Sequence, residues 1–209
     1  MTVNSHRFAK TLIEKRFKDK KDISSAFKNE LETILLNPET FEASNFEKYS
    51  LEEVFNYLQC SHDFYLGVYI PKIENTLFQL QSRLVEDYWS VKLLILFIQS
   101  YKKELIEHIH EEEKVLFAFV KNLLEGKKCD NSSEFILDHF IHTHNDNVVI
   151  QLAELKKDLL TFNEDLKGDL IFEMLFNQLN VFQKDLMIHG LIEDHVFLRK
   201  IKDRIASKS

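Results

Sequence analysis

Glycine and proline are scarce in this chain, and their scarcity limits the folds open to it. The 209 residues include only four Gly and two Pro, whereas a β-sheet protein of this size needs many such residues in the turns between its strands. Apolar residues instead recur at the three- and four-residue spacing that places them on one face of a helix. The sequence therefore predicts an all-α fold.

Turn-forming residues divide the chain after about residue 50 into four long helical segments. We expect these helices at about residues 50–84, 87–125, 133–162 and 169–206. Ser50 and Glu53 form a capping box at the start of the first helix, and Pro71 in its interior is expected to bend it. Because short loops join antiparallel neighbours, residues 50–209 are predicted to form an up-and-down four-helix bundle.

Residues 1–49 are predicted to form a short helical extension in front of the bundle. Apolar spacing indicates two helices, at about 7–18 and 24–36, followed by a loop. The sequence indicates no role for this extension.

Composition and charge disfavour several classes of function. The net charge of −7 and the isoelectric point near 5.7 disfavour nucleic-acid binding, which depends on clustered Lys and Arg. The N-terminal residues contain no apolar signal core, and the longest apolar run, Leu93–Ile98, is too short to cross a bilayer. Cys60 and Cys129 form no CxxC motif, as expected in a reducing compartment. We expect a soluble cytoplasmic protein with no nucleic-acid or membrane partner.

An internal repeat relates the two halves of the predicted bundle. The segment HIHEEEKVLF at residues 108–117 aligns with HGLIEDHVFL at 189–198, and both read H-x-x-x-E-x-x-V. A shift of 82 residues likewise aligns His62 and the apolar residues after it with His144 and the apolar residues after it. We interpret the repeat as two helical hairpins, each with a His in its first helix and an HxxxE pair in its second.

These motifs are predicted to lie in one layer of the bundle. Residues four apart share a helix face, so each HxxxE pair can point inward. Antiparallel helices bring residues level when they are equally far from the connecting loop, and the distances from the three loops agree within about two residues, or ~3 Å. The candidate metal ligands are His62, His108, Glu112, His144, His189 and Glu193.

The type and order of these ligands favour iron. Mixed His and carboxylate donors from four helices suit iron, and two bridging Glu residues suit a pair of ions. Zinc is an alternative, although a zinc site usually needs only three or four of these groups. In ferritin-like sites Glu precedes His by three residues, whereas here His precedes Glu by four. We therefore expect a hemerythrin-like arrangement and a non-haem di-iron centre of two iron ions.

At these motifs the chain resembles the hemerythrin-like (HHE cation-binding) domain proteins, and among them the repair-of-iron-centres di-iron family. The resemblance rests on KYSLEEVFNYLQCSHDFYLGVYIP, HIHEEEKVLF, THND and HGLIEDHVF, and it covers about residues 48–205. It implies a His-rich di-iron site with bridging Glu at the same six residues. It also implies reaction with oxygen or nitric oxide, iron–sulfur proteins as partners, and repair of iron–sulfur clusters after oxidative or nitrosative stress.

The chain departs from that family's pattern in several places. Residues 1–49 contain no cysteine, whereas members commonly begin with a small domain that carries a cysteine pair. Members often show His-His at the position of His62 and Asp63, so Asp63 is a rival ligand, although the internal repeat favours His62. A further His that many members carry after the first helix is absent from LFQLQSRLVEDYW. Oxygen-carrying hemerythrins have HxxxH in the third helix, but Phe140 and Val148 flank His144, which disfavours reversible oxygen carriage.

Two other functions stay open at this point: a sensor of oxygen, nitric oxide or iron that signals through a protein partner, and a metal-free structural bundle. No Ser-His-Asp pattern or phosphate-binding loop appears, which favours a metal-binding protein over a conventional enzyme. A carboxylate, Asp146, Glu111 or Glu113, is expected to hold a ligand His through its other ring nitrogen. The histidines expected to point away from the ligand face are His110, His139, His142 and His195.

Overall fold

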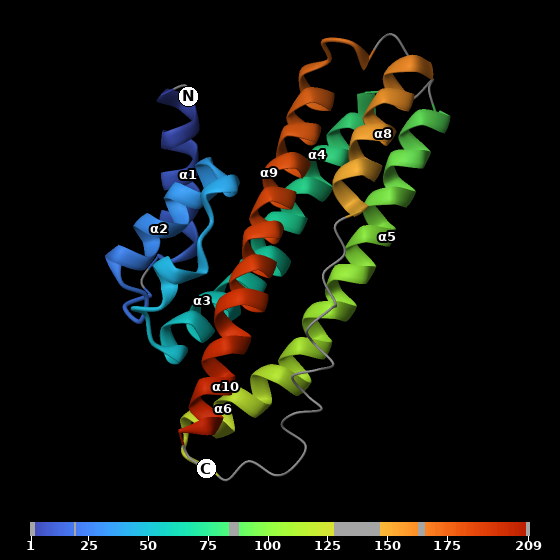
Figure 1. The fold of residues 1–209 in the computed structure, drawn as a ribbon. Helices are drawn as coiled ribbons and strands as arrows, with labels where there is room; N and C mark the ends of the chain where they lie inside the picture. The colour runs from blue at the N-terminus through green and yellow to red at the C-terminus, as the bar shows by residue number, and fades with distance from the viewer. Residues whose placement is uncertain (1–2, 19, 84–87, 128–146, 163–165, 208–209) are drawn as a thin grey trace. The chain divides into compact units, whose positions relative to one another are not determined.

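The computed structural model describes residues 3–18, 20–83, 88–127, 147–162 and 166–207 (Figure 1). Every regular element in these ranges is a helix, which confirms the predicted all-α fold. Over the same ranges, no helix combines the length and the apolar character needed to span a lipid bilayer.

The chain folds into two compact units, each built from separated parts of the sequence. The first comprises Met1–Phe64, Glu111–His144 and Lys184–Ser209, and the second comprises Tyr65–His110 and Asn145–Gln183. Both units therefore draw residues from α5 (Tyr88–Glu112) and α9 (Leu170–Ile192). The residues of the N-terminal extension belong to the first unit, and a domain boundary after residue 49 stays a prediction.

The first unit begins with two helices close to those predicted. α1 spans Val3–Arg16 and α2 spans Ser25–Leu36. Ser24 caps α2, because its side-chain oxygen accepts a hydrogen bond from the Phe27 amide at 3.2 Å. Two short 3-10 helices, η1 (Pro38–Thr40) and η2 (Ala43–Phe46), lie within the segment predicted as a loop.

The predicted capping box at the start of α3 (Leu51–Phe64) is formed in part. Ser50 Oγ accepts a hydrogen bond from the Glu53 amide at 3.0 Å. The Glu53 carboxylate instead accepts a hydrogen bond from the Ser24 amide at 2.8 Å. Because Ser24 caps α2, this bond connects the start of α3 to the start of α2.

An aromatic cluster around Phe27 joins the extension to α3. The Phe27 ring lies 4.7 Å from the Tyr49 ring, 5.5 Å from the Phe46 ring and 5.4 Å from the Tyr57 ring, between centroids. All four side chains are buried. The extension and α3 therefore share one hydrophobic core, which is the main stabilising contribution available to short helices.

The rest of the first unit continues from the ends of α5 and α9. The π-helical segments η4 (Glu113–Phe117) and η6 (Glu193–Phe197) come next, followed by α6 (Ala118–Leu124) and α10 (Leu198–Ala206). Gly126 follows α6 with a φ of 77°, the left-handed conformation that favours glycine after a helix. The predicted end of this helix near Glu125 is therefore confirmed.

The second unit contains η3 (Tyr65–Tyr69), α4 (Ile70–Arg83), α8 (Asn147–Phe162) and the first parts of α5 and α9. The Phe182 ring is central to its core, 4.8 Å from the Tyr69 ring and 5.4 Å from the Tyr65 ring. η3 is π-helical and ends just before Pro71. The bend expected at this proline stays a prediction.

The predicted long helices agree with the described ones wherever they can be compared. α5, η4 and α6 correspond to the helix expected at 87–125, and α9, η6 and α10 to the helix expected at 169–206. The helix expected at 133–162 is described from Asn147 onward, and its earlier part lies outside the described residues. The arrangement of these helices as a four-helix bundle stays a prediction.

Candidate metal centre

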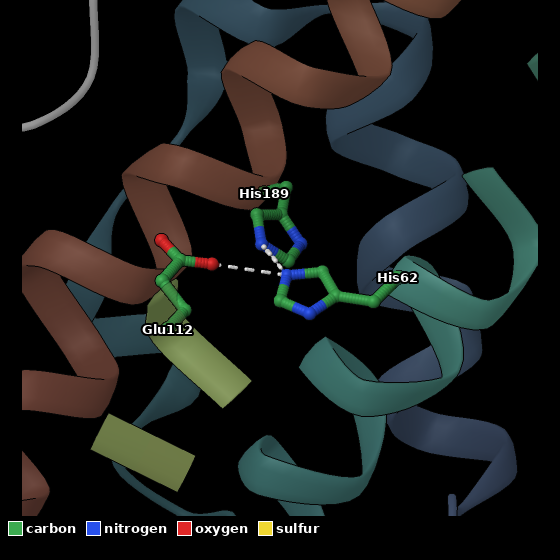
Figure 2. Close-up of side chains that lie close together, drawn as sticks. All are labelled: His62, Glu112 and His189. Atoms are coloured by element: carbon green, nitrogen blue, oxygen red, sulfur yellow. Dashed lines mark hydrogen bonds and ion pairs between the residues drawn. The ribbon is translucent and has the colours of Figure 1, made fainter. Parts of the chain in front are cut away.

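Three buried side chains from three helices converge in the first unit. His62 of α3, Glu112 at the end of α5 and His189 of α9 each offer one ligand atom, and these atoms lie within 4.8 Å of one another. Figure 2 shows the three side chains pointing toward one another. Their exposed fractions are 1%, 0% and 3%. A carboxylate this deeply buried needs a compensating charge or strong hydrogen bonds, so the cluster is suited to hold a cation.

The distances within the cluster are short. His62 Nε2 lies 3.1 Å from Glu112 Oε2 and 3.2 Å from His189 Nε2 (Figure 2). Two ring nitrogens can face each other this closely only when at least one lacks a hydrogen. At least one imidazole lone pair is therefore directed into the space that the three side chains share.

The protonation state of His189 suits a metal ligand. Burial lowers the pKa of His189 from its ordinary value, and the nearby Glu193 carboxylate offsets part of that effect. His189 is therefore neutral at pH 7, and the neutral imidazole is the form that binds a metal ion.

Glu193 adds a second carboxylate to the cluster. It follows His189 by one helical turn, and its Oε2 lies 3.5 Å from His189 Nε2. Its side chain is buried. The predicted inward orientation of the second HxxxE pair is therefore observed for both of its members.

Glu113 holds the outer nitrogen of His62. Its Oε1 lies 3.3 Å from His62 Nδ1, and its side chain is 40% exposed. If Nδ1 carries the hydrogen and donates to Glu113, Nε2 keeps its lone pair for a metal ion, which is the usual arrangement of a ligand histidine. Glu113 was one of three carboxylates expected in this role from the sequence.

Aromatic side chains cover one side of the cluster. The His62 ring stacks on the Phe117 ring with a centroid distance of 5.0 Å and an interplanar angle of 6°. Phe117 in turn contacts Phe55 at 5.1 Å and Phe197 at 6.0 Å, and all three Phe are buried. This apolar wall limits access of water and strengthens the electrostatic interactions inside it.

Each helix that carries a ligand changes to π geometry close to that ligand. η3 begins three residues after His62, η4 begins one residue after Glu112, and η6 begins at Glu193. Single π turns inside α-helices occur often at functional sites. The sequence did not predict these three segments.

Two of the six predicted ligands are not placed in the cluster by the structure. His108 is half-buried in α5 and belongs to the second compact unit. His144 lies outside the described residues. Asp63, the rival of His62, has an exposed side chain, whereas His62 is buried in the cluster, so the geometry favours His62.

The other histidines agree with their predicted orientation as far as they are described. His110 and His195 are exposed. His139 and His142 lie outside the described residues.

A buried ion pair next to the cluster was missed from the sequence. Asp185 contacts Arg16, and both side chains are almost fully buried. Asp185 precedes His189 by four residues, a spacing that places both on one helix face and that could have drawn attention to it. Nothing in the local sequence identified Arg16 as its partner.

Comparisons with protein-family models, curated proteins and solved structures found no match for this chain. A ligand must therefore be inferred from the donor atoms alone. Imidazole nitrogens and carboxylate oxygens suit iron and zinc among the common divalent ions. The residues present thus fit a metal ion, and the cluster is a candidate metal centre.

Proposed function

We propose that this chain is an iron-binding protein with a hemerythrin-like four-helix bundle and a non-haem di-iron centre. The observation that supports the proposal most is the buried set of His62, Glu112 and His189, whose ligand atoms lie within 4.8 Å of one another. Glu193 extends this set. The sequence pattern predicts the same donors from the HxxxE pairs and from the internal repeat that includes His62.

The proposal assigns the remaining predicted ligands to the second iron ion. His108 precedes Glu112 by one helical turn, so it can share the inward face of its helix. His144 is the counterpart of His62 in the internal repeat. Together they would give two ions a similar set of His and Glu donors.

The surrounding residues have separate tasks in the proposed centre. His62 and His189 provide nitrogen donors, and Glu113 fixes the ring of His62. Glu112 and Glu193 provide negative charge that balances the charge of the cations. Phe117 and its aromatic neighbours keep bulk water away from the ring of His62.

Iron held by these ligands would supply a redox-active centre that can bind oxygen or nitric oxide. We therefore place the protein in the response to oxidative or nitrosative stress, with repair of iron–sulfur clusters as its leading role, iron–sulfur proteins as partners and the cytoplasm as its compartment. The burial of the cluster and the aromatic wall beside it support a binding site for a small diatomic molecule better than one for a large polar substrate.

Metal analysis of the purified protein tests this proposal. Protein prepared anaerobically and loaded with Fe²⁺ should retain about two iron ions per chain after desalting, measured by elemental analysis. The double variant His62→Ala with His189→Ala should lose most of this iron, since it removes both nitrogen donors of the described cluster. His195→Ala is the matched control, because this exposed His lies in η6, six residues after His189.

Two results would contradict the proposal. One is wild-type protein that retains no iron under these conditions. The other is a double variant with unchanged metal content and melting temperature, which is the behaviour of a structural bundle whose His and Glu are incidental.

A further inference from the structure

A buried ion pair connects the N-terminal extension to the helix that carries His189. Arg16, the last residue of α1, contacts Asp185 of α9 through Nη2, and the two side chains are 1% and 3% exposed. Burying such a pair costs more desolvation energy than the attraction usually returns, and apolar residues of similar size often give equal or greater stability. The ion pair is therefore better explained by the orientation that it imposes on α1 and α9 than by a contribution to the stability of the fold.

The same guanidinium also reaches the helix that carries His62. Arg16 Nη1 donates a hydrogen bond to Ser61 Oγ at 3.3 Å, and Ser61 Oγ donates to the Tyr57 carbonyl at 2.9 Å. Ser61 directly precedes His62 in α3, and Asp185 precedes His189 by one turn in α9. One side chain of the extension thus contacts both helices next to their metal-ligating histidines.

The position of the guanidinium is fixed by packing as well as by polar contacts. Its central carbon lies 5.0 Å from the centre of the Phe64 ring and 5.7 Å from the centre of the Phe17 ring. A planar guanidinium can donate in two directions while it stacks on aromatic rings, which a lysine ammonium cannot reproduce. The contacts made by Arg16 are therefore specific to arginine.

A third residue links this ion pair to the metal cluster electrostatically. Tyr57 is fully buried, and its ring centre lies 6.1 Å from that of His189. Burial raises the pKa of the Tyr57 hydroxyl, and the charges of Arg16, Asp185 and Glu193 all influence it. The ion pair and the carboxylate Glu193 therefore act electrostatically on the same phenol group.

We propose that Arg16 is a positioning residue for the metal centre, which holds α3 and α9 so that His62 and His189 converge. The role rests on the proposed function, since it presumes that the cluster binds a metal ion. This role also assigns a function to the N-terminal extension, because the extension supplies the Arg16 side chain that orients the ligands of the metal centre. Loss of an indirect support of this kind should weaken metal binding by about tenfold, the lower end of the range for residues that orient metal ligands.

The test compares full-length variants by their Fe²⁺ affinity, from anaerobic calorimetric titration, and by the visible spectrum of the Co²⁺-loaded protein, which reports ligand geometry. Arg16→Met with Asp185→Leu removes both buried charges and leaves apolar side chains of similar volume, so it should fold with a melting temperature close to that of the wild type. Arg16→Lys keeps the positive charge but loses the planar guanidinium that donates in two directions. Lys48→Met is the control, because it breaks an exposed ion pair with Glu30 in the same unit.

Our proposal predicts that the double variant folds but binds Fe²⁺ about tenfold more weakly, with a shifted Co²⁺ spectrum, and that Arg16→Lys recovers only part of the affinity. Lys48→Met should match the wild type in both measurements. A folded double variant with wild-type affinity and spectrum would overturn the positioning role and leave the metal centre intact. Wild-type protein that binds neither ion would overturn the proposed function and the positioning role together.

Discussion

Replacement of Phe27 by Ala should destabilise the whole protein, although Phe27 lies in an extension that precedes the predicted bundle. Its side chain is fully buried, and three aromatic rings lie within 5.5 Å of its own ring. Phe→Ala substitutions in cores cost about 3–5 kcal/mol, and the cost is higher where the neighbours cannot collapse into the cavity. Because rigid aromatic rings surround Phe27, we expect a loss near the upper end, about 4–5 kcal/mol.

Urea unfolding, followed by far-UV circular dichroism, measures this loss as a difference in unfolding free energy. Phe78→Ala is the matched control, because the same side chain is 67% exposed there; its effect should stay within ~0.5 kcal/mol. A loss below about 1 kcal/mol for Phe27→Ala would refute the shared core. A separate early transition with the main transition unshifted would show that the extension unfolds on its own, which would also refute it.

Three further predictions concern the metal cluster and its surroundings. Glu113→Ala should weaken Fe²⁺ binding ~10–100-fold, because His62 loses the partner of its Nδ1. Glu52→Ala, which removes an exposed carboxylate from the helix that carries His62, should leave the Fe²⁺ affinity unchanged in calorimetric titration. Binding of Fe²⁺ at a free concentration of about 100 times Kd stabilises the fold by ~2.7 kcal/mol, so removal of the metal with a chelator should lower the melting temperature by ~5–11 °C. Scanning calorimetry measures this shift, and an unchanged midpoint would contradict metal binding. Cys60 should react slowly with iodoacetamide at pH 7.5 in the folded protein and much faster in urea, because burial raises the pKa of its thiol and keeps it protonated until higher pH. Mass spectrometry of the peptide that contains Cys60 measures both rates, and equal rates would show that this thiol is accessible in the folded protein.

The helices could be predicted because their signals are local. Ser50 and Gly126 mark helix ends by their own chemistry, and both act in the structure as expected. The Glu53 carboxylate could not be assigned in the same way, because it bonds to the amide of Ser24. The residues around Glu53 do not indicate a hydrogen bond to a residue 29 positions away.

The metal cluster could be predicted in part for a related reason. The HxxxE spacing identified Glu112, His189 and Glu193 because residues one turn apart share a helix face. His62 has no HxxxE partner, so its prediction depended on the internal repeat, on its distance from the connecting loop and on the family resemblance. The ion pair of Arg16 and Asp185 joins residues 169 positions apart and belongs to no repeat, so its existence depends on tertiary packing.

The π segments next to the ligands have a consequence for how this sequence tolerates insertions and deletions. A π turn accommodates one residue more than an α turn, so it shifts the phase of every residue that follows by about 100°. Deletion of one residue within Glu113–Phe117 would leave Glu112 in place and would convert the π turn to an α turn, so that α6 keeps its buried face in phase. When homologous chains are aligned by their HxxxE motifs, a one-residue gap just after the glutamate would therefore mark a helix that has lost its π turn.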